Sequence, residues 1–247
     1  MKNVFTFLLL LFSLLCNGQS PKLFTTDKEL SSSLINQIYQ DRNGFIWIAT
    51  EDGLNRYDGA KFTIYKHEPN NEHSLAHNFV RTVFEDSKGH LLIGTYIGIQ
   101  MYDPATDNFT PLAKLEDTGE TLESNINSFI ERKNGEIWVS GNVLCKLDIK
   151  DHLLTVRKVD IAVTSPGSLF EDKKQNVWMA KGEEGVYQLT PDNQLTLHLS
   201  KDNGYVKSIC EDQRGNIYVG SIRKGLFIYD KERKTFVPVD LKEKGEL

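Results

Sequence analysis

The sequence predicts an all-β protein made of about five successive four-stranded antiparallel sheets, the blades of a β-propeller. Three observations predict this fold: a short motif returns at a nearly constant interval, turn residues separate short apolar runs, and β-branched and aromatic residues are frequent. The chain has 247 residues, of which 39% are hydrophobic and 26% charged. These fractions are typical of a folded globular protein and exclude a disordered chain or a multi-span membrane protein.

The repeated motif reads acid-Asp-x-x-Gly-x-apolar-aromatic-apolar-small. Its Asp and Gly are the residues that favour a tight turn, and the apolar positions after them favour a strand. The aromatic position falls, in order, at Trp47, Leu92, Trp138, Trp178 and Tyr218. The intervals are therefore 45, 46, 40 and 40 residues. This period, with several short strands in each copy, is typical of a propeller blade.

The second repeat illustrates the predicted blade. Strands are expected over 80–84, 91–95, 99–102 and 109–112, with a turn at 86–89 between the first two. Applied to every copy, the pattern predicts blades over 34–66, 79–113, 125–158, 166–199 and 205–240.

Five blades can be arranged in two ways. They are expected to form part of a seven-bladed ring within a longer protein. In the alternative arrangement they close as a five-bladed ring, with 23–26 completing the last blade and removing its open edge.

The tryptophans that recur in the repeats, and the two cysteines, have structural interpretations. The three tryptophans stand at one register, which predicts that they pack between neighbouring sheets rather than bind sugars at the surface. Cys145 and Cys210 lie in non-adjacent repeats, so both are expected to be free and buried.

The first residues predict export. Residues 4–15 are apolar except for Thr6 and Ser13, follow a basic start and precede a small residue at Gly18. This pattern predicts a signal peptide over 1–18 and propeller repeats over 19–247. Two alternatives are an uncleaved anchor and a lipoprotein in which Cys16 is acylated, although Leu15 precedes Cys16 where a small residue is usual.

Charge and motifs narrow the function. The net charge is -5 and basic residues are scattered, which argues against a nucleic-acid partner. The six histidines form no metal-ligating pattern, and no nucleophile motif occurs, so no metal, cofactor or catalytic residue is predicted.

A binding site is predicted from the blade geometry instead. The first strand of each blade lines the central channel, and counting back five residues from each turn Asp or its equivalent gives one position per blade. These positions are Asn36, Arg81, Asn127, Gly167 and Lys207. The four polar residues Asn36, Arg81, Asn127 and Lys207 are candidates for a ring at the channel mouth that contacts sugar hydroxyls or a uronate carboxylate. The alternative is a water-filled channel without a specific ligand.

Two segments of the first repeat resemble a known family. Asp-Arg-Asn-Gly-Phe-Ile-Trp-Ile-Ala-Thr over 41–50 and Asp-Gly-Leu-Asn-Arg-Tyr-Asp-Gly over 52–59 resemble the two-component-regulator propeller repeat. The resemblance extends over about 22–240 and is good in the second and fifth repeats. It is weaker in the third and fourth, where Arg132 replaces the turn Asp and Gln175 replaces the turn Gly.

The resemblance implies a function. In this family, the repeats form the periplasmic sensor of Bacteroidetes hybrid two-component systems, which detect oligosaccharides and regulate polysaccharide-utilisation genes. It therefore implies an exported, non-catalytic sensor, followed by membrane and kinase regions of the same protein that tether it to the inner membrane, and a homodimer. Alternatives are a stand-alone exported scaffold for protein interactions and a propeller polysaccharide lyase or glycosidase.

Overall fold

The computed structural model describes residues 23–26, 29–199 and 204–240, so the predicted signal peptide lies outside the described residues. Every regular element in the described part is a strand. The strands are β1 (Ile35–Gln40), β2 (Ile46–Thr50), β3 (Gly53–Tyr57), β4 (Phe62–Tyr65), β5 (Val80–Glu85), β6 (Leu91–Thr95), β7 (Ile99–Asp103), β8 (Asn108–Phe109), β9 (Lys114–Leu115), β10 (Ser128–Glu131), β11 (Ile137–Ser140), β12 (Leu144–Lys150), β13 (Leu153–Lys158), β14 (Leu169–Glu171), β15 (Val177–Lys181), β16 (Gly185–Leu189), β17 (Leu195–Leu199), β18 (Tyr205–Glu211), β19 (Ile217–Ile222), β20 (Gly225–Asp230) and β21 (Thr235–Pro238).

These strands form five antiparallel meanders, and the predicted fold class is confirmed. Four sheets have four strands in chain order, β1 to β4, β5 to β8, β14 to β17 and β18 to β21. The third blade has β10 to β13 and gains β9, which pairs in parallel with β13 at its outer edge. That fifth strand comes from the connection between the second and third blades. The fourth strand of the second blade, expected over 109–112, is only the two-residue β8.

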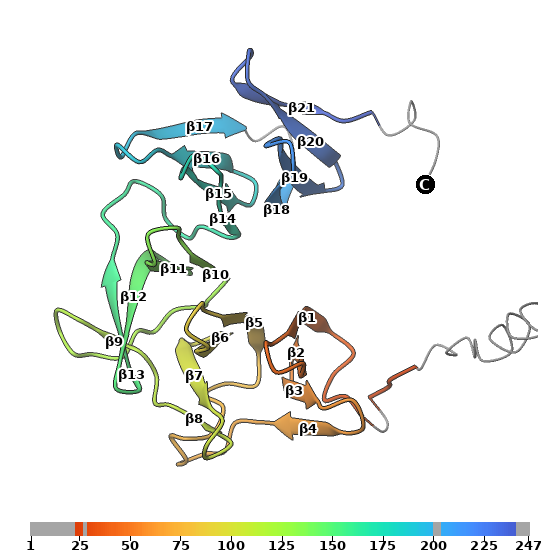
Figure 1. Cartoon of the computed structure of the whole chain (residues 1–247), viewed down its shortest axis with the longest axis vertical. Helices are drawn as coiled ribbons and strands as arrows, with labels where there is room; N and C mark the ends of the chain where they lie inside the picture. The colour runs from red at the N-terminus through yellow and green to blue at the C-terminus, as the bar shows by residue number, and fades with distance from the viewer. Residues whose placement is uncertain (1–22, 27–28, 200–203, 241–247) are drawn as a thin grey trace, which may run out of the picture.

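The blades follow one another around an arc (Figure 1). The first strand of each blade, β1, β5, β10, β14 or β18, faces the centre of this arc. Because the strands alternate in direction, the connections between blades and the starts of the first strands lie on one face of the propeller. The turns between first and second strands lie on the opposite face.

The turn Asp of the motif links the turn to the strand that follows it. In the first blade, Asp41 Oδ1 accepts hydrogen bonds from the backbone N–H groups of Asn43 and Phe45, both at 3.0 Å. Its Oδ2 accepts a hydrogen bond from Nε1 of Trp47 at 2.8 Å. The spacing of Asp and Trp in the motif therefore satisfies a buried indole N–H, which would otherwise be costly.

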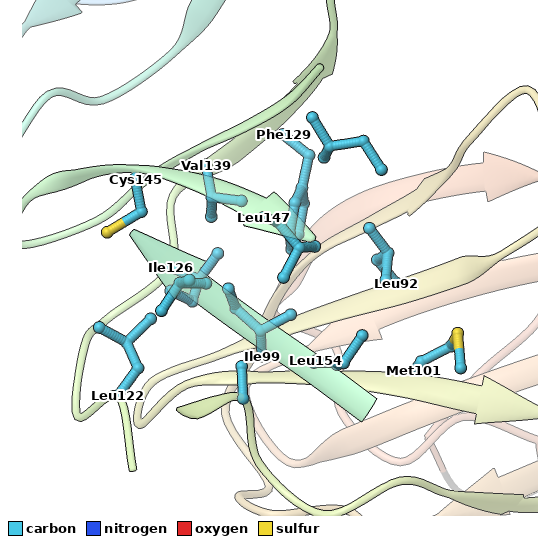
Figure 2. Packing of buried hydrophobic residues seen from close by; sticks show 13 residues of the cluster. Leu92, Ile99, Met101, Leu122, Ile126, Phe129, Val139, Cys145, Leu147 and Leu154 are labelled. Carbon is cyan, nitrogen blue, oxygen red and sulfur yellow. The ribbon is translucent and has the colours of Figure 1, made fainter. Parts of the chain in front are cut away.

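The hydrophobic core is divided among the blade interfaces. Figure 2 shows one such cluster, in which Leu92 and Met101 of the second blade face Phe129 and Leu147 of the third. The tryptophans occupy these interfaces, as predicted, with exposed fractions of 1% for Trp47, 4% for Trp138 and 1% for Trp178.

Polar contacts join consecutive blades near the turns. The glutamate that ends the first strand of one blade accepts a backbone N–H from the turn of the blade before it. Glu85 accepts from Arg42 at 2.8 Å, and Glu131 accepts from Ser87 at 2.7 Å. The same contact joins Glu171 to the N–H of Lys133 at 2.7 Å. These three glutamates thus orient the second, third and fourth blades against the blade before each of them.

The positions of the first and last blades bear on the alternative of a closed five-bladed ring. The first and fifth blades stand apart (Figure 1). The alternative in which residues 23–26 complete the last blade is wrong, because the Phe24 ring packs against Tyr57 and Phe62 of the first blade, at centroid distances of 5.2 and 5.0 Å. This segment therefore covers part of the first blade's outer face.

The two cysteines differ in environment. Both are free, but only Cys145 is buried, so the prediction that both are buried is wrong for Cys210. Cys210 pairs with Tyr218 across β18 and β19. In the earlier blades, the side chains at the equivalent position of the first strand face the next blade. In the described part of the chain that face of the fifth blade is open, which exposes the thiol. Burial raises the pKa of the Cys145 thiol to about 11, so that it packs as a neutral apolar group.

Gln175 is expected to lower stability through its backbone conformation. Its φ is 67°, at the position where the other four turns have a glycine, such as Gly135 with φ 83°. A non-glycine residue is disfavoured there, so Gln175→Gly is expected to raise the free energy of unfolding by about 0.5–1 kcal/mol. The reverse change, Gly135→Gln, should lower it, and a Cβ at Gly135 meets no atom within 4 Å. Urea unfolding of both variants tests this, and equal stabilities would contradict it.

Candidate functional site

The residues predicted for the channel mouth lie together. Asn36, Arg81, Asn127 and Lys207 line one pocket of about 310 Å³ at the centre of the arc, and Gly167 lines it too. All five blades contribute to it. The remaining lining residues in the described part of the chain are Gln37, Thr82, Ser128, Ser165, Ser168, Gly182, Tyr205 and Val206. The pocket lies on the face of the propeller where the first strands begin.

An irregularity in the sheets orients three of these side chains. The pairing of the first and second strands shifts register between Ile35 and Gln37 in the first blade, so that Asn36 has no partner in the ladder. The same shift occurs around Arg81 in the second blade and around Lys207 in the fifth. A β-bulge turns the extra residue out of the regular alternation. The predicted positions are therefore the bulged residues of their strands.

The two asparagines of the site connect neighbouring blades. Asn36 Nδ2 donates to the carbonyl oxygen of Val80 at 2.7 Å. Asn127 Nδ2 donates to the carbonyl oxygen of Pro166 at 3.1 Å, and its Oδ1 accepts from a terminal nitrogen of Arg81 at 3.2 Å. These amides thus hold the pocket wall in place, and they position Arg81.

Arg81 retains most of its hydrogen-bonding capacity. Its Nε is one of two buried side-chain polar atoms without a partner in the described part of the chain. The guanidinium carbon lies 5.5 Å from the centroid of the Phe79 ring, within the range of a cation–π contact. A guanidinium has five N–H donors in a rigid fork, so Arg81 can bind a further acceptor in the pocket.

Part of the pocket wall was not predicted from the sequence. Tyr205 lines the pocket and is 50% exposed, and Ser165 and Ser168 add hydroxyls. Tyr205 stands two residues before Lys207, as Phe79 stands two residues before Arg81. A comparison of the residues that flank the predicted ring would have found this repeat of aromatic-x-cation.

Two larger hollows lie away from the centre. One, of about 720 Å³, lies beside the connection between the second and third blades, and the other, of about 680 Å³, adjoins the hairpin of β12 and β13. Both are formed by loops and the outer strands of the second and third blades. The central pocket is the better candidate because polar side chains of all five blades converge there.

Within 23–26, 29–199 and 204–240, no three side chains of His, Cys, Asp or Glu are grouped so as to hold a metal ion. Over the same ranges, no helix has the length and apolar character needed to cross a membrane.

The fold and this site define the chain as a β-propeller with a polar pocket at its centre. More particularly, three segments of the chain, residues 29–52, 74–96 and 200–223, match the family model described as the two component regulator propeller. These segments belong to the first, second and fifth repeats, in which the motif is most complete. The resemblance inferred from the sequence is confirmed.

This chain spans 6% of a similar histidine kinase and about a third of two similar solved structures. "Histidine kinase P4" of Formosa agariphila is 37% identical over 83 residues, which are 31% of this chain and 6% of the kinase. The extracellular domain of a one component system from B. thetaiotaomicron superposes with a TM-score of 0.71 at 18% identity, over 90% of this chain and 33% of that one.

A second solved structure, the extracellular domain of a hybrid two component system of B. thetaiotaomicron, has a TM-score of 0.55 at 19% identity. It is matched over 88% of this chain and 36% of its own length. At these identities the likeness to both structures establishes the fold.

Proposed function

We propose that this chain is the extracytoplasmic, ligand-binding part of a two-component signalling protein, and that the central pocket binds an oligosaccharide. The observation that carries the proposal is the convergence of Asn36, Arg81, Asn127 and Lys207 on one pocket in a chain with two component regulator propeller repeats. Hydrogen-bonding side chains in a concave site suit a ligand rich in hydroxyl groups. The similarity to a histidine kinase and to extracellular domains supports this assignment.

The pocket favours binding over catalysis. Among the described residues that line it there is no Asp, Glu, His or Cys. Glycoside cleavage by the usual route requires a pair of carboxyl groups, and other general acid–base catalysis most often uses histidine or a carboxylate. The proposal is therefore a sensor segment rather than a glycosidase.

Sensing requires that ligand binding change the state of a signalling region. A ligand shifts a conformational equilibrium only if it binds one state more tightly. The pocket is formed by five blades, so a ligand that bridges them would favour one arrangement of the blades. In the proposal, this arrangement is passed to membrane and kinase regions of the same protein in a homodimer, tethered to the inner membrane, and alters expression of polysaccharide-utilisation genes.

The test is a titration of neutral and acidic oligosaccharides into the full-length protein by isothermal titration calorimetry. Asn36→Trp places a large side chain at an exposed position of the pocket wall without changing its charge. This variant is expected to lose binding of any oligosaccharide that binds the wild type. Asn43→Trp is the matched control, because Asn43 is exposed in the turn at the opposite end of the same blade.

Binding that survives in Asn36→Trp as well as in Asn43→Trp would place the ligand elsewhere. A wild-type protein that binds no oligosaccharide would overturn the proposed function and favour a scaffold for protein partners. A cellular readout is the expression of polysaccharide-utilisation genes on the addition of a binding oligosaccharide, which Asn36→Trp should abolish.

A further inference from the structure

Two matching pairs of side chains border the central pocket. In the second blade, Phe79 stands two residues before Arg81, and in the fifth blade Tyr205 stands two residues before Lys207. Arg81 and Lys207 are the bulged residues of β5 and β18, and both line the pocket. Two blades on different sides of the pocket thus each supply one cation with an aromatic ring beside it.

The charge of the pocket is opposite to that of the protein. The chain has a net charge of -5, yet the described residues that line the pocket include two cations and no acid. Elsewhere in the described part of the chain some basic groups are paired with acids: Arg42 contacts Glu85, and Arg132 contacts Glu171. Unpaired cations in a concave site concentrate positive potential and attract anions.

Arg81 is oriented for an anion. Its contact with the amide oxygen of Asn127, at 3.2 Å, uses one of its N–H groups. Its Nε is buried without a partner, so part of the cost of removing this donor from water is not recovered. The remaining terminal N–H groups of the guanidinium could bind a carboxylate or sulfate oxygen pair in a bidentate contact, which lysine alone cannot make.

Tyr205 offers a flat apolar surface beside Lys207. Its ring is half exposed and rests against the backbone at Gly182, where an added Cβ would lie 2.8 Å from Cε2 of Tyr205. The C–H groups on one face of a pyranose can pack on such a ring, whose π face carries partial negative charge.

We propose that the ligand of this pocket is an acidic oligosaccharide, whose carboxylate or sulfate ester binds between Arg81 and Lys207 while a sugar ring packs on Tyr205. This inference rests on the proposed function, because it specifies the ligand of the same site. The positive charge of the pocket is expected to favour acidic over neutral glycans.

The test compares three probes of equal length: an oligogalacturonate, a sulfated galacto-oligosaccharide and a neutral galacto-oligosaccharide. The full-length protein is expected to bind one of the acidic probes more tightly than the neutral one, with an affinity that falls as sodium chloride is raised. Arg81→Gln and Lys207→Gln should each weaken binding of that probe about tenfold or more, and weaken binding of the neutral probe by a smaller factor. Lys61→Gln removes an exposed charge outside the pocket and should change neither.

The outcomes separate the two proposals. If the neutral probe binds as tightly as both acidic probes and neither glutamine variant changes any affinity, while Asn36→Trp abolishes binding, the acidic ligand is refuted and the oligosaccharide site stands. If no probe binds the wild type, the proposed function itself fails. Inorganic sulfate that binds as tightly as the sulfated probe would refute the role of the sugar.

The aromatic contact has its own test. Tyr205→Phe keeps the ring and should bind the acidic probe as the wild type does. Tyr205→Ala should bind it about 3- to 10-fold more weakly, in keeping with the energy of an aromatic contact. Equal affinities for the alanine and phenylalanine variants would overturn the packing of a sugar ring on Tyr205.

Discussion

Replacing Trp47 with alanine is expected to lower the free energy of unfolding by about 3–5 kcal/mol, the usual cost of truncating a fully buried tryptophan. Trp47 is 1% exposed and lies between the first and second blades. Its ring lies 5.9 Å from that of Tyr65, in a stacked arrangement, and 4.9 Å from that of Tyr102, edge to face. The variant would leave a cavity lined by these rings.

The Trp47→Ala variant is also expected to lose polar contacts around the cavity. The guanidinium carbon of Arg56 lies 5.6 Å from the centroid of the Trp47 ring, and Arg56 also pairs with Asp107 at 2.9 Å. Asp41 would lose the indole N–H that it accepts at 2.8 Å. The interface of the two blades would therefore lose apolar area and polar contacts at once.

Chemical unfolding of the Trp47→Ala and Trp47→Phe variants, followed by far-ultraviolet circular dichroism, measures this effect. Phenylalanine keeps most of the apolar area and loses the hydrogen bond to Asp41, so its expected cost is smaller, about 1–3 kcal/mol. An alanine variant within about 1 kcal/mol of the wild type would contradict the assignment of Trp47 to a packed interface.

Asp172→Ala is the second change with a large expected effect. The Asp172 side chain is 6% exposed and accepts four hydrogen bonds. Oδ1 accepts the backbone N–H of Lys174 at 2.8 Å and that of Asn176 at 2.9 Å. Oδ2 accepts Nδ2 of Asn176 at 2.8 Å and Nε1 of Trp178 at 2.9 Å. Alanine would leave several buried donors unsatisfied, at an expected cost of about 3 kcal/mol or more.

Asp212→Ala in the fifth blade is the matched control. Asp212 makes the same backbone contacts, with Arg214 and Asn216, but the group at the aromatic position is the hydroxyl of Tyr218 at 3.4 Å. This turn borders no further blade in the described part of the chain, so its donors can reach water. The loss of stability should be smaller than for Asp172→Ala, and thermal unfolding of the two variants compares them. Equal losses would show that burial of the indole N–H is not the cause.

The sequence by itself determined the repeat and the strands within it. The turn residues and the alternation of apolar positions are local properties, and they predicted β6 at 91–95 and the burial of all three tryptophans. The channel-mouth positions also followed from the repeat, because each blade places the same strand toward the centre. These features depend on contacts within one blade or between copies of one unit.

Only the tertiary structure decided features that depend on which segments meet. Phe24 packs on the first blade rather than the last, and β9 joins the third blade, because these contacts join segments outside the repeat pattern. The exposure of Cys210 depends on whether another blade covers its face.

Some properties of the pocket also followed from the sequence, whereas others were decided only by the tertiary structure. Sequence spacing placed Arg81 and Lys207 at one level, but the β-bulges that turn them from the ladder come from strand pairing, which no spacing reveals. The unpartnered Nε of Arg81 and the lack of acids among the described wall residues likewise depend on which side chains the blades bring together around the pocket. Local chemistry determines the elements, whereas the charge and shape of a site depend on side chains far apart in the chain.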